Sequence, residues 1–140
     1  MQEYKTQVRV RYAETDQMGV VYHANYLVWM EVGRVEACRE RGFEYREMEI
    51  QDGILLAVTE ANCRYLSPAR YDDEVTIVTV IAEATPRRVT FTYTMLCGAR
   101  KLATGESKHI FLNREMRPAR IPAKYYPLFG IAAPAGDSAQ

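Results

Sequence analysis

The chain has 140 residues, of which 48% are hydrophobic and 26% are charged, so we expect one folded domain and exclude a largely disordered chain. Its 18 Lys and Arg residues balance 18 Asp and Glu residues, which speaks against a nucleic-acid-binding protein. The three cysteines form no Cys-x-x-Cys motif, and no apolar run approaches the roughly 20 residues of a membrane span. The first residues do not resemble a signal peptide, so we expect a cytoplasmic protein with no membrane span.

Residues 4–12 alternate apolar and polar side chains, which predicts a strand with one solvent-exposed face. A polar turn over residues 13–19 follows. From about Val21 the apolar spacing becomes helical, and Gly42 fits a C-terminal cap, so we predict a helix of about 20 residues. The apolar stripe of this helix comprises Tyr22, Tyr26, Trp29, Gly33 and Ala37.

The rest of the chain predicts a sheet. Strands are expected over residues 54–66, 74–84, 88–97 and 102–113, the last with a bulge at Gly105. A short helix is expected from Pro122 to Tyr126. We assign residues 1–130 to a single domain and residues 131–140 to a flexible tail.

Short links between the last four strands require antiparallel pairing. The sequence therefore predicts an α+β fold with one helix on the concave face of a five-stranded antiparallel sheet. One helix cannot cover both faces and both edges, so we also expect a homo-oligomer.

Residues 12–26 concentrate the chemistry. A helix N-terminus presents unpaired N–H groups that can hold an oxyanion, and Asp16 lies just upstream, where a carboxylate can attack a carbonyl or deprotonate water. His23 is expected in the first helical turn, where the helix dipole favours the neutral imidazole.

Each of these residues also has a purely structural interpretation. Asp16 can serve as a turn former or a helix cap, and His23 as a satisfied first-turn histidine. The tyrosines at positions 12, 22 and 26 can simply pack. Glu14 is expected to be solvated or paired with the helix dipole, and Glu31 and Arg34 are expected to form an exposed ion pair.

The motif Tyr12-x-Glu14-Thr15-Asp16-x-Met18-Gly19-x-Val21-Tyr22-His23-x-Asn25-Tyr26, followed by Trp29, Glu31 and Arg34, resembles the signature of hotdog-fold acyl-CoA thioesterases. The similarity is strongest to the 4-hydroxybenzoyl-CoA thioesterase family and its Tol-Pal-cluster type, and it covers residues 4–128. Two weaker supports are Tyr71-Asp72-Asp73-Glu74-Val75 and Arg117-Pro118-x-Arg120-Ile121-Pro122.

The resemblance implies that Asp16 is the nucleophile or general base, that the oxyanion donor is a backbone N–H at or beside His23, and that the His23 side chain assists. Tyr22, Asn25 and Tyr26 complete the implied oxyanion and substrate-binding set. Relatives often have Asp where this chain has Glu14, which keeps the charge.

The resemblance further implies an acyl-CoA substrate, an acyl carrier protein as an alternative substrate carrier, and a dimer or a dimer of dimers (a homotetramer). No metal or cofactor is expected, because a thioester is already an activated acyl group. Candidates for CoA phosphate contacts are Arg87, Arg88, Arg100, Lys101, Arg114, Arg117, Arg120 and Lys124.

Two other functions stay open at this point. A hotdog module that binds acyl-CoA or acyl carrier protein without hydrolysis would need neither Asp16 nor His23. A dehydratase of 3-hydroxyacyl thioesters would pair a histidine with a carboxylate in a different motif, which this sequence lacks.

Overall fold

The computed structural model describes residues 2–132 and contains a five-stranded antiparallel sheet. Its strands are β1 (Glu3–Arg9), β2 (Leu55–Tyr65), β3 (Glu74–Ala84), β4 (Arg88–Cys97) and β5 (Arg100–Leu112). Their order across the sheet is β1-β3-β4-β5-β2, so β1 and β2 form the two edges. The predicted antiparallel sheet is confirmed.

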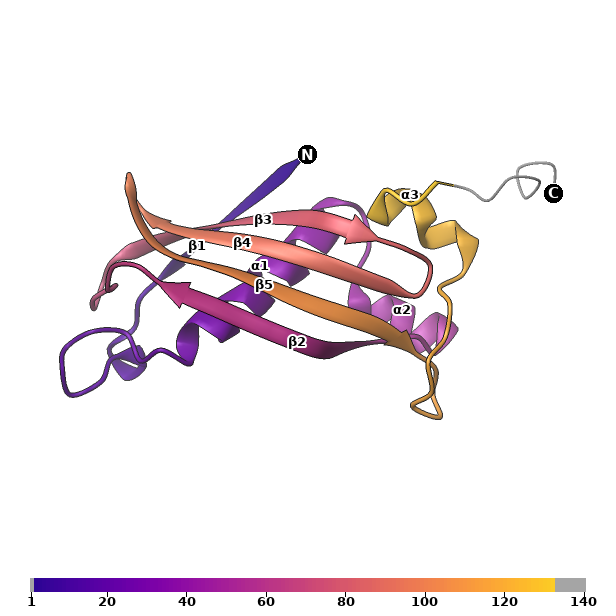
Figure 1. Ribbon diagram of the computed structural model, residues 1–140, viewed down its shortest axis with the longest axis horizontal. Coiled ribbons are helices and arrows are strands. Elements are labelled where there is room, and N and C mark those ends of the chain that lie inside the picture. The colour runs from indigo at the N-terminus through magenta and orange to yellow at the C-terminus, as the bar shows by residue number, and fades with distance from the viewer. Residues whose placement is uncertain (1, 133–140) are drawn as a thin grey trace.

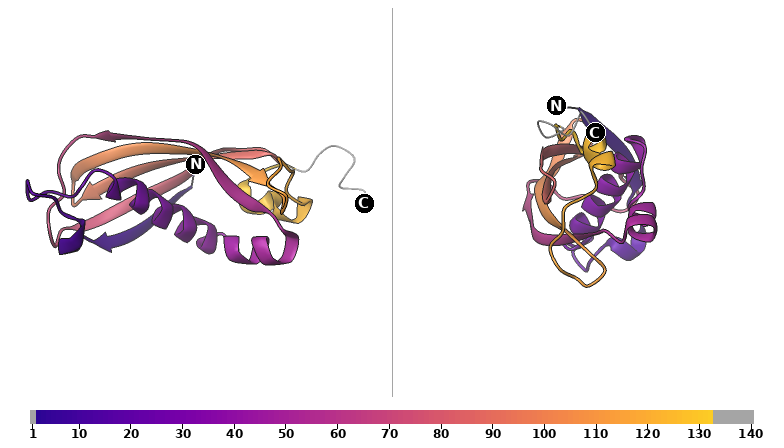
Figure 2. Two further views of the ribbon diagram at one scale, coloured as in Figure 1. Left: turned by 90° about the horizontal axis from the view of Figure 1, so that it is seen from below. Right: turned by 90° about the vertical axis from the view of Figure 1, so that its right-hand side faces the viewer.

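The main helix, α1 (Asn25–Glu40), lies along the concave face of the sheet and packs mainly against β1 and β3 (Figures 1 and 2). The helix α2 (Tyr45–Asp52) follows it. Short helical turns η1 (Tyr12–Glu14), η2 (Ala123–Tyr125) and α3 (Tyr126–Phe129) complete the described chain. The last two confirm the short helix expected near the C-terminus.

The main helix begins later than predicted. It starts at Asn25 rather than near Val21 and has 16 residues instead of about 20. Val21 is held in extended backbone, because it pairs with Thr15 and its N–H donates to the Ala69 carbonyl at 2.9 Å. Tyr22 therefore lies outside the helix and is 47% exposed, whereas the other members of the predicted stripe are buried.

The sequence analysis missed α2. Gly42, at φ +103°, ends α1 as expected, and the chain then forms a second helix that ends at Gly53. Residues 45–52 are mostly polar, and Met48 is the one buried residue that α2 contributes. Such a short polar segment has too little apolar periodicity to predict a helix.

Glycines set how closely α1 approaches the sheet. A Cβ at Gly33 would lie 2.5 Å from Thr79 Oγ1 and 2.7 Å from Ile77 Cγ2, so only glycine fits there. The predicted bulge at Gly105 is wrong, since Gly105 pairs regularly with Cys63 and Tyr93. A Cβ at Gly105 would lie 2.0 Å from Met30 Cε. The position therefore requires glycine because the Met30 side chain of α1 packs directly against the strand there.

The predicted tail lies mostly outside the described residues, which end at position 132, and the single domain over residues 1–130 stays a prediction. Within the described chain, no helix is both long and apolar enough to cross a membrane.

Candidate active site

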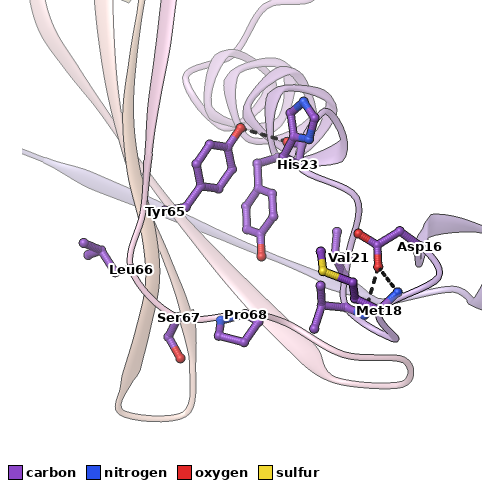
Figure 3. Close-up of a pocket in the computed structure, with 10 residues that line it drawn as sticks. Asp16, Met18, Val21, His23, Tyr65, Leu66, Ser67 and Pro68 are labelled. Carbon is purple, nitrogen blue, oxygen red and sulfur yellow. Dashed lines mark hydrogen bonds between the residues drawn. The ribbon is translucent and has the colours of Figure 1, made fainter.

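A cavity of about 330 Å³ lies where β2 ends, between the loop that carries Asp16 and the start of α1 (Figure 3). The connection from β2 to β3 forms its opposite wall. The lining residues are Asp16, Met18, Val20, Val21, His23, Tyr26, Tyr65, Leu66, Ser67 and Pro68. The cavity therefore brings together the two residues that the resemblance marks as catalytic.

Asp16 is half-buried and shapes the loop that carries it. Its N–H donates to the Val20 carbonyl at 2.8 Å, and its carbonyl accepts from Gly19 at 3.0 Å. One carboxylate oxygen, Oδ1, accepts from the Met18 N–H at 2.8 Å and more weakly from the Val20 N–H at 3.5 Å. Within residues 2–132, Oδ2 has no hydrogen-bond partner, so Asp16 is a turn former that keeps a free oxygen at the cavity.

His23 is not in the first helical turn as predicted. It precedes Ala24, the N-cap of α1, and its side chain is exposed beside Tyr22, with ring centroids 4.5 Å apart. Its carbonyl accepts two hydrogen bonds, from the Tyr26 N–H at 3.3 Å and from the Tyr65 hydroxyl at 2.9 Å.

The start of α1 presents free amide donors. The N–H groups of Asn25, Tyr26 and Leu27 bond to the carbonyls of residues 22–24. In contrast, the amides of His23 and Ala24 donate to no other residue of the described chain. Free amides at a helix N-terminus favour negative charge.

The prediction that Glu14 is solvated is wrong. Glu14 is 6% exposed, and its carboxylate accepts from the Trp29 indole at 3.2 Å and from the Arg11 amide at 2.8 Å. Its carbonyl accepts from the Tyr22 N–H at 2.8 Å and from Asn25 Nδ2 at 3.0 Å. Glu14 therefore fastens the loop before Asp16 to the first turns of α1.

Tyr26 lines the cavity from α1 and is almost fully buried. Its hydroxyl accepts from the Ala69 N–H at 3.3 Å. Burial raises the pKa of Tyr26, so the phenol stays protonated at neutral pH. Tyr22 does not line the cavity, and the Asn25 side chain faces the Glu14 carbonyl, so their contacts with substrate remain predictions.

The sequence analysis missed the wall formed by residues 65–68. The strand predicted over residues 54–66 carries no information about what the segment after it faces. Of the predicted phosphate-binding cations, Arg100 contacts this wall, donating to Ser67 Oγ at 2.8 Å and to the Pro68 carbonyl at 2.7 Å. Arg88 and residues 114–124 lie at the other end of the sheet (Figure 1).

The predicted Glu31–Arg34 ion pair is absent from residues 2–132. Arg34 instead turns toward the sheet, where its guanidinium donates to the Tyr93 hydroxyl at 3.2 Å. A buried chain continues from Tyr93 to Ser107 at 2.6 Å and from Ser107 to His109 Nε2 at 2.7 Å.

Residues 10–128 match the family model described as the Thioesterase-like superfamily. The chain belongs to this superfamily. A putative acyl-CoA thioesterase of Bacillus subtilis, YneP, is 41% identical over 112 residues, covering 79% of this chain and 80% of that protein.

Two solved structures are similar to this chain in fold and sequence. A DHNA-CoA thioesterase of Staphylococcus aureus is 33% identical with a TM-score of 0.83, over 89% of this chain and 84% of that one. A hypothetical protein of Thermus thermophilus is 36% identical with a TM-score of 0.87, over 92% and 96%. The predicted hotdog fold, the family and the class of thioester hydrolase are confirmed.

Proposed function

We propose that this chain hydrolyses acyl-CoA thioesters to a free carboxylic acid and CoA, with Asp16 as the catalytic carboxylate. The observation that carries the proposal is the cavity that Asp16 and His23 line together beside the free amides of α1. The names of two relatives support the substrate class, since one is a putative acyl-CoA thioesterase and the other a DHNA-CoA thioesterase.

Two routes use the free oxygen of Asp16. In the first, Oδ2 attacks the thioester carbonyl, the C–S bond breaks and CoA leaves as a thiolate that takes up a proton; water then hydrolyses the acyl–Asp16 anhydride. In the second, Asp16 removes a proton from water, and the resulting hydroxide attacks the carbonyl directly. Both routes place negative charge on the carbonyl oxygen.

The amides of His23 and Ala24 stabilise this oxyanion. They lack other partners in the described chain and lie at the positive end of the α1 dipole. Such donors contribute about 10²–10³-fold to kcat in acyl-transfer enzymes. The exposed His23 side chain assists by hydrogen bonding, and Tyr26 forms the buried wall beside the reacting carbon. Tyr22 and Asn25 hold the loop through the Glu14 carbonyl.

Arg100 is our candidate for a CoA phosphate contact, because it lies against the wall of the cavity. An acyl carrier protein would deliver its thioester through a phosphopantetheine arm to the same cavity. We assign the enzyme to the cytoplasm, where the free cysteines Cys38, Cys63 and Cys97 of the described chain stay reduced.

The oligomer in the proposal is a dimer that forms across β2, with a tetramer as a dimer of dimers. Edge strand β2 offers unpaired backbone groups along 11 residues. Its inner face is only partly covered by α1, which packs mainly against β1 and β3. Apolar side chains are exposed on both sides of this gap: Leu27 and Val28 on α1, and Val58 and Tyr65 on β2.

The decisive experiment measures thiol release from acetyl-, hexanoyl-, palmitoyl- and benzoyl-CoA by the wild type and by Asp16→Asn. Asparagine keeps the oxygen that accepts from Met18, so the loop should stay folded. We expect kcat to fall at least ~10²-fold on the best substrate. Asp72→Asn, on an exposed aspartate at the surface, is the matched control and should keep full activity.

The outcomes separate the competing functions. Turnover within a few-fold of wild type in Asp16→Asn would remove Asp16 from its role. Ligand-dependent thermal stabilisation without any turnover by the wild type would favour the non-catalytic binding module. A single turnover in water labelled with oxygen-18 tests the first route, because label found on Asp16 requires an anhydride that water has opened at its aspartyl carbon.

A further inference from the structure

Tyr65 reaches from the sheet to the start of α1. It is the last residue of β2, and its hydroxyl donates a 2.9 Å hydrogen bond to the carbonyl oxygen of His23 (Figure 3). The same oxygen accepts the Tyr26 N–H at 3.3 Å. Two donors from different elements therefore hold the peptide group that joins His23 to Ala24.

The other end of that peptide group is the Ala24 N–H. In a trans peptide the C=O and N–H bonds point in opposite directions, so a carbonyl directed toward Tyr26 and Tyr65 directs this N–H away from the helix body. The Ala24 N–H donates to no other residue of the described chain. Hydrogen bonds accepted by the carbonyl also polarise the peptide and strengthen its N–H as a donor.

Neighbouring groups fix the Tyr65 ring. It packs edge-on against the buried Tyr26 ring, with centroids 5.1 Å apart and planes at 84°, and it lies 6.3 Å from the His23 ring. Desolvation and the neighbouring Cys63 thiol raise the pKa of Tyr65 to about 12, so the hydroxyl keeps its proton at neutral pH. Tyr65 is therefore a fixed donor.

We infer that Tyr65 is a positioning residue for the thioesterase reaction: its hydroxyl orients and polarises the His23–Ala24 peptide, whose N–H holds the oxyanion. The inference rests on the proposed function, because it assumes that a thioester carbonyl binds at the start of α1. It adds a residue from the edge strand to the groups proposed to act on the reacting carbonyl, which otherwise come from the first loop and the start of α1.

The test variant is Tyr65→Phe, which removes the hydroxyl and leaves the ring against Tyr26. We expect kcat on the best acyl-CoA to fall about 10-fold, the effect of losing one hydrogen bond that acts on the transition state, with KM changed less than about 2-fold. Tyr71→Phe is the matched control, because Tyr71 is 58% exposed and lies outside the cavity. It should leave both constants unchanged.

A spectroscopic readout separates positioning from folding. In the Asp16→Asn background, bound benzoyl-CoA should survive long enough for its carbonyl stretch to be measured by difference infrared spectroscopy. Polarisation by the Ala24 N–H lowers this frequency relative to free benzoyl-CoA, and adding Tyr65→Phe should remove part of that lowering. A variant that is merely less stable would lower the melting temperature without changing the frequency of the bound carbonyl.

Two results would overturn the inference while leaving the proposed function intact. One is full kcat in Tyr65→Phe together with an unchanged carbonyl frequency. The other is a raised KM at constant kcat, which would make Tyr65 a ground-state contact. Absence of thiol release by the wild type would overturn the proposed function, and the role of Tyr65 with it.

Discussion

The Trp29 indole, in the second turn of α1, donates a 3.2 Å hydrogen bond to the buried carboxylate of Glu14. The second carboxylate oxygen accepts from the Arg11 amide at 2.8 Å. Glu14 lies two residues before Asp16, so this contact ties the loop that carries the proposed catalytic carboxylate to the helix that carries the proposed oxyanion donors.

Glu14→Ala should therefore destabilise the protein by about 2–4 kcal/mol, because it leaves the buried Trp29 N–H and the partly buried Arg11 amide unpaired. Urea unfolding followed by tryptophan fluorescence measures this directly, since the chain has one tryptophan. Glu40→Ala, on the exposed end of α1, is the control and should change stability by less than about 0.5 kcal/mol. Equal effects of the two substitutions would contradict the role of Glu14.

The contrast between Glu14 and Asp16 shows where sequence reasoning stops. The motif over residues 12–26 singles out Asp16, His23 and Tyr26, which line the cavity, and also Tyr22 and Asn25, which do not. The catalytic roles of these residues stay predictions. Burial of Glu14 depends on Trp29, whose approach to the loop follows from how α1 packs on the sheet. The sequence of a polar loop does not show that its carboxylate will meet a buried indole, so it favours a solvated Glu14.

Gly33 supplies a second prediction. An alanine there would gain about 1 kcal/mol of helix propensity, but its Cβ would collide with Thr79 and Ile77. We expect a net loss of about 1–3 kcal/mol, as in overpacked cores. Differential scanning calorimetry of Gly33→Ala should show a lower melting temperature, and an increase would refute the close approach of α1 to β3.

A double-mutant cycle with Thr79→Ala tests the cause. The buried Thr79 hydroxyl has no hydrogen-bond partner in the structure, so removing it should cost little. In the Gly33→Ala background the same change should recover part of the lost stability, because it removes the nearest clashing atom. Strict additivity of the two free-energy changes would show that the collision with Thr79 is not the cause.

His109 should make folding sensitive to acid. Burial and, second, the positive charge of Arg34 lower the pKa of His109 to about 4 in the folded state, against about 6.5 when unfolded. At a pH between the two pKa values, His109 is protonated in the unfolded chain but neutral in the folded one. The free energy of unfolding therefore falls as the pH drops from about 6.5 to about 4, by about 3 kcal/mol in all. Chemical unfolding at a series of pH values should show that slope.

His109→Gln tests whether the His109 imidazole causes this pH dependence. This variant should lose most of the stability difference between pH 6.5 and pH 4, because glutamine does not titrate. Tyr93→Phe is the matched control: it removes a hydroxyl from the same buried chain but leaves the imidazole, so its pH dependence should match wild type at lower overall stability. A wild-type slope in His109→Gln would assign the acid sensitivity to other groups.

Arg34 and Gly105 explain why part of the interior escaped prediction. The spacing of Glu31 and Arg34 suits an exposed helical pair, yet Arg34 turns to Tyr93 because α1 packs on the sheet along that side. Gly105 looked like a bulge because glycine inside a strand often marks one, and only the position of Met30 identifies it as a contact. The strands were predicted well, because the alternation of apolar and polar residues lies within each strand and does not depend on which element packs against it.

Substitution at Val58 tests the proposed dimer. Val58 is 57% exposed and pairs directly with the buried His109, so it lies on the inner face of β2 beside the uncovered side of α1. Val58→Lys should put a charge into the subunit contact and convert the protein to monomers, as measured by light scattering after size-exclusion chromatography. Ile50→Lys, at a 65% exposed position on α2, should leave the assembly intact. A wild-type mass for Val58→Lys at micromolar concentration would exclude this face of β2 from the interface.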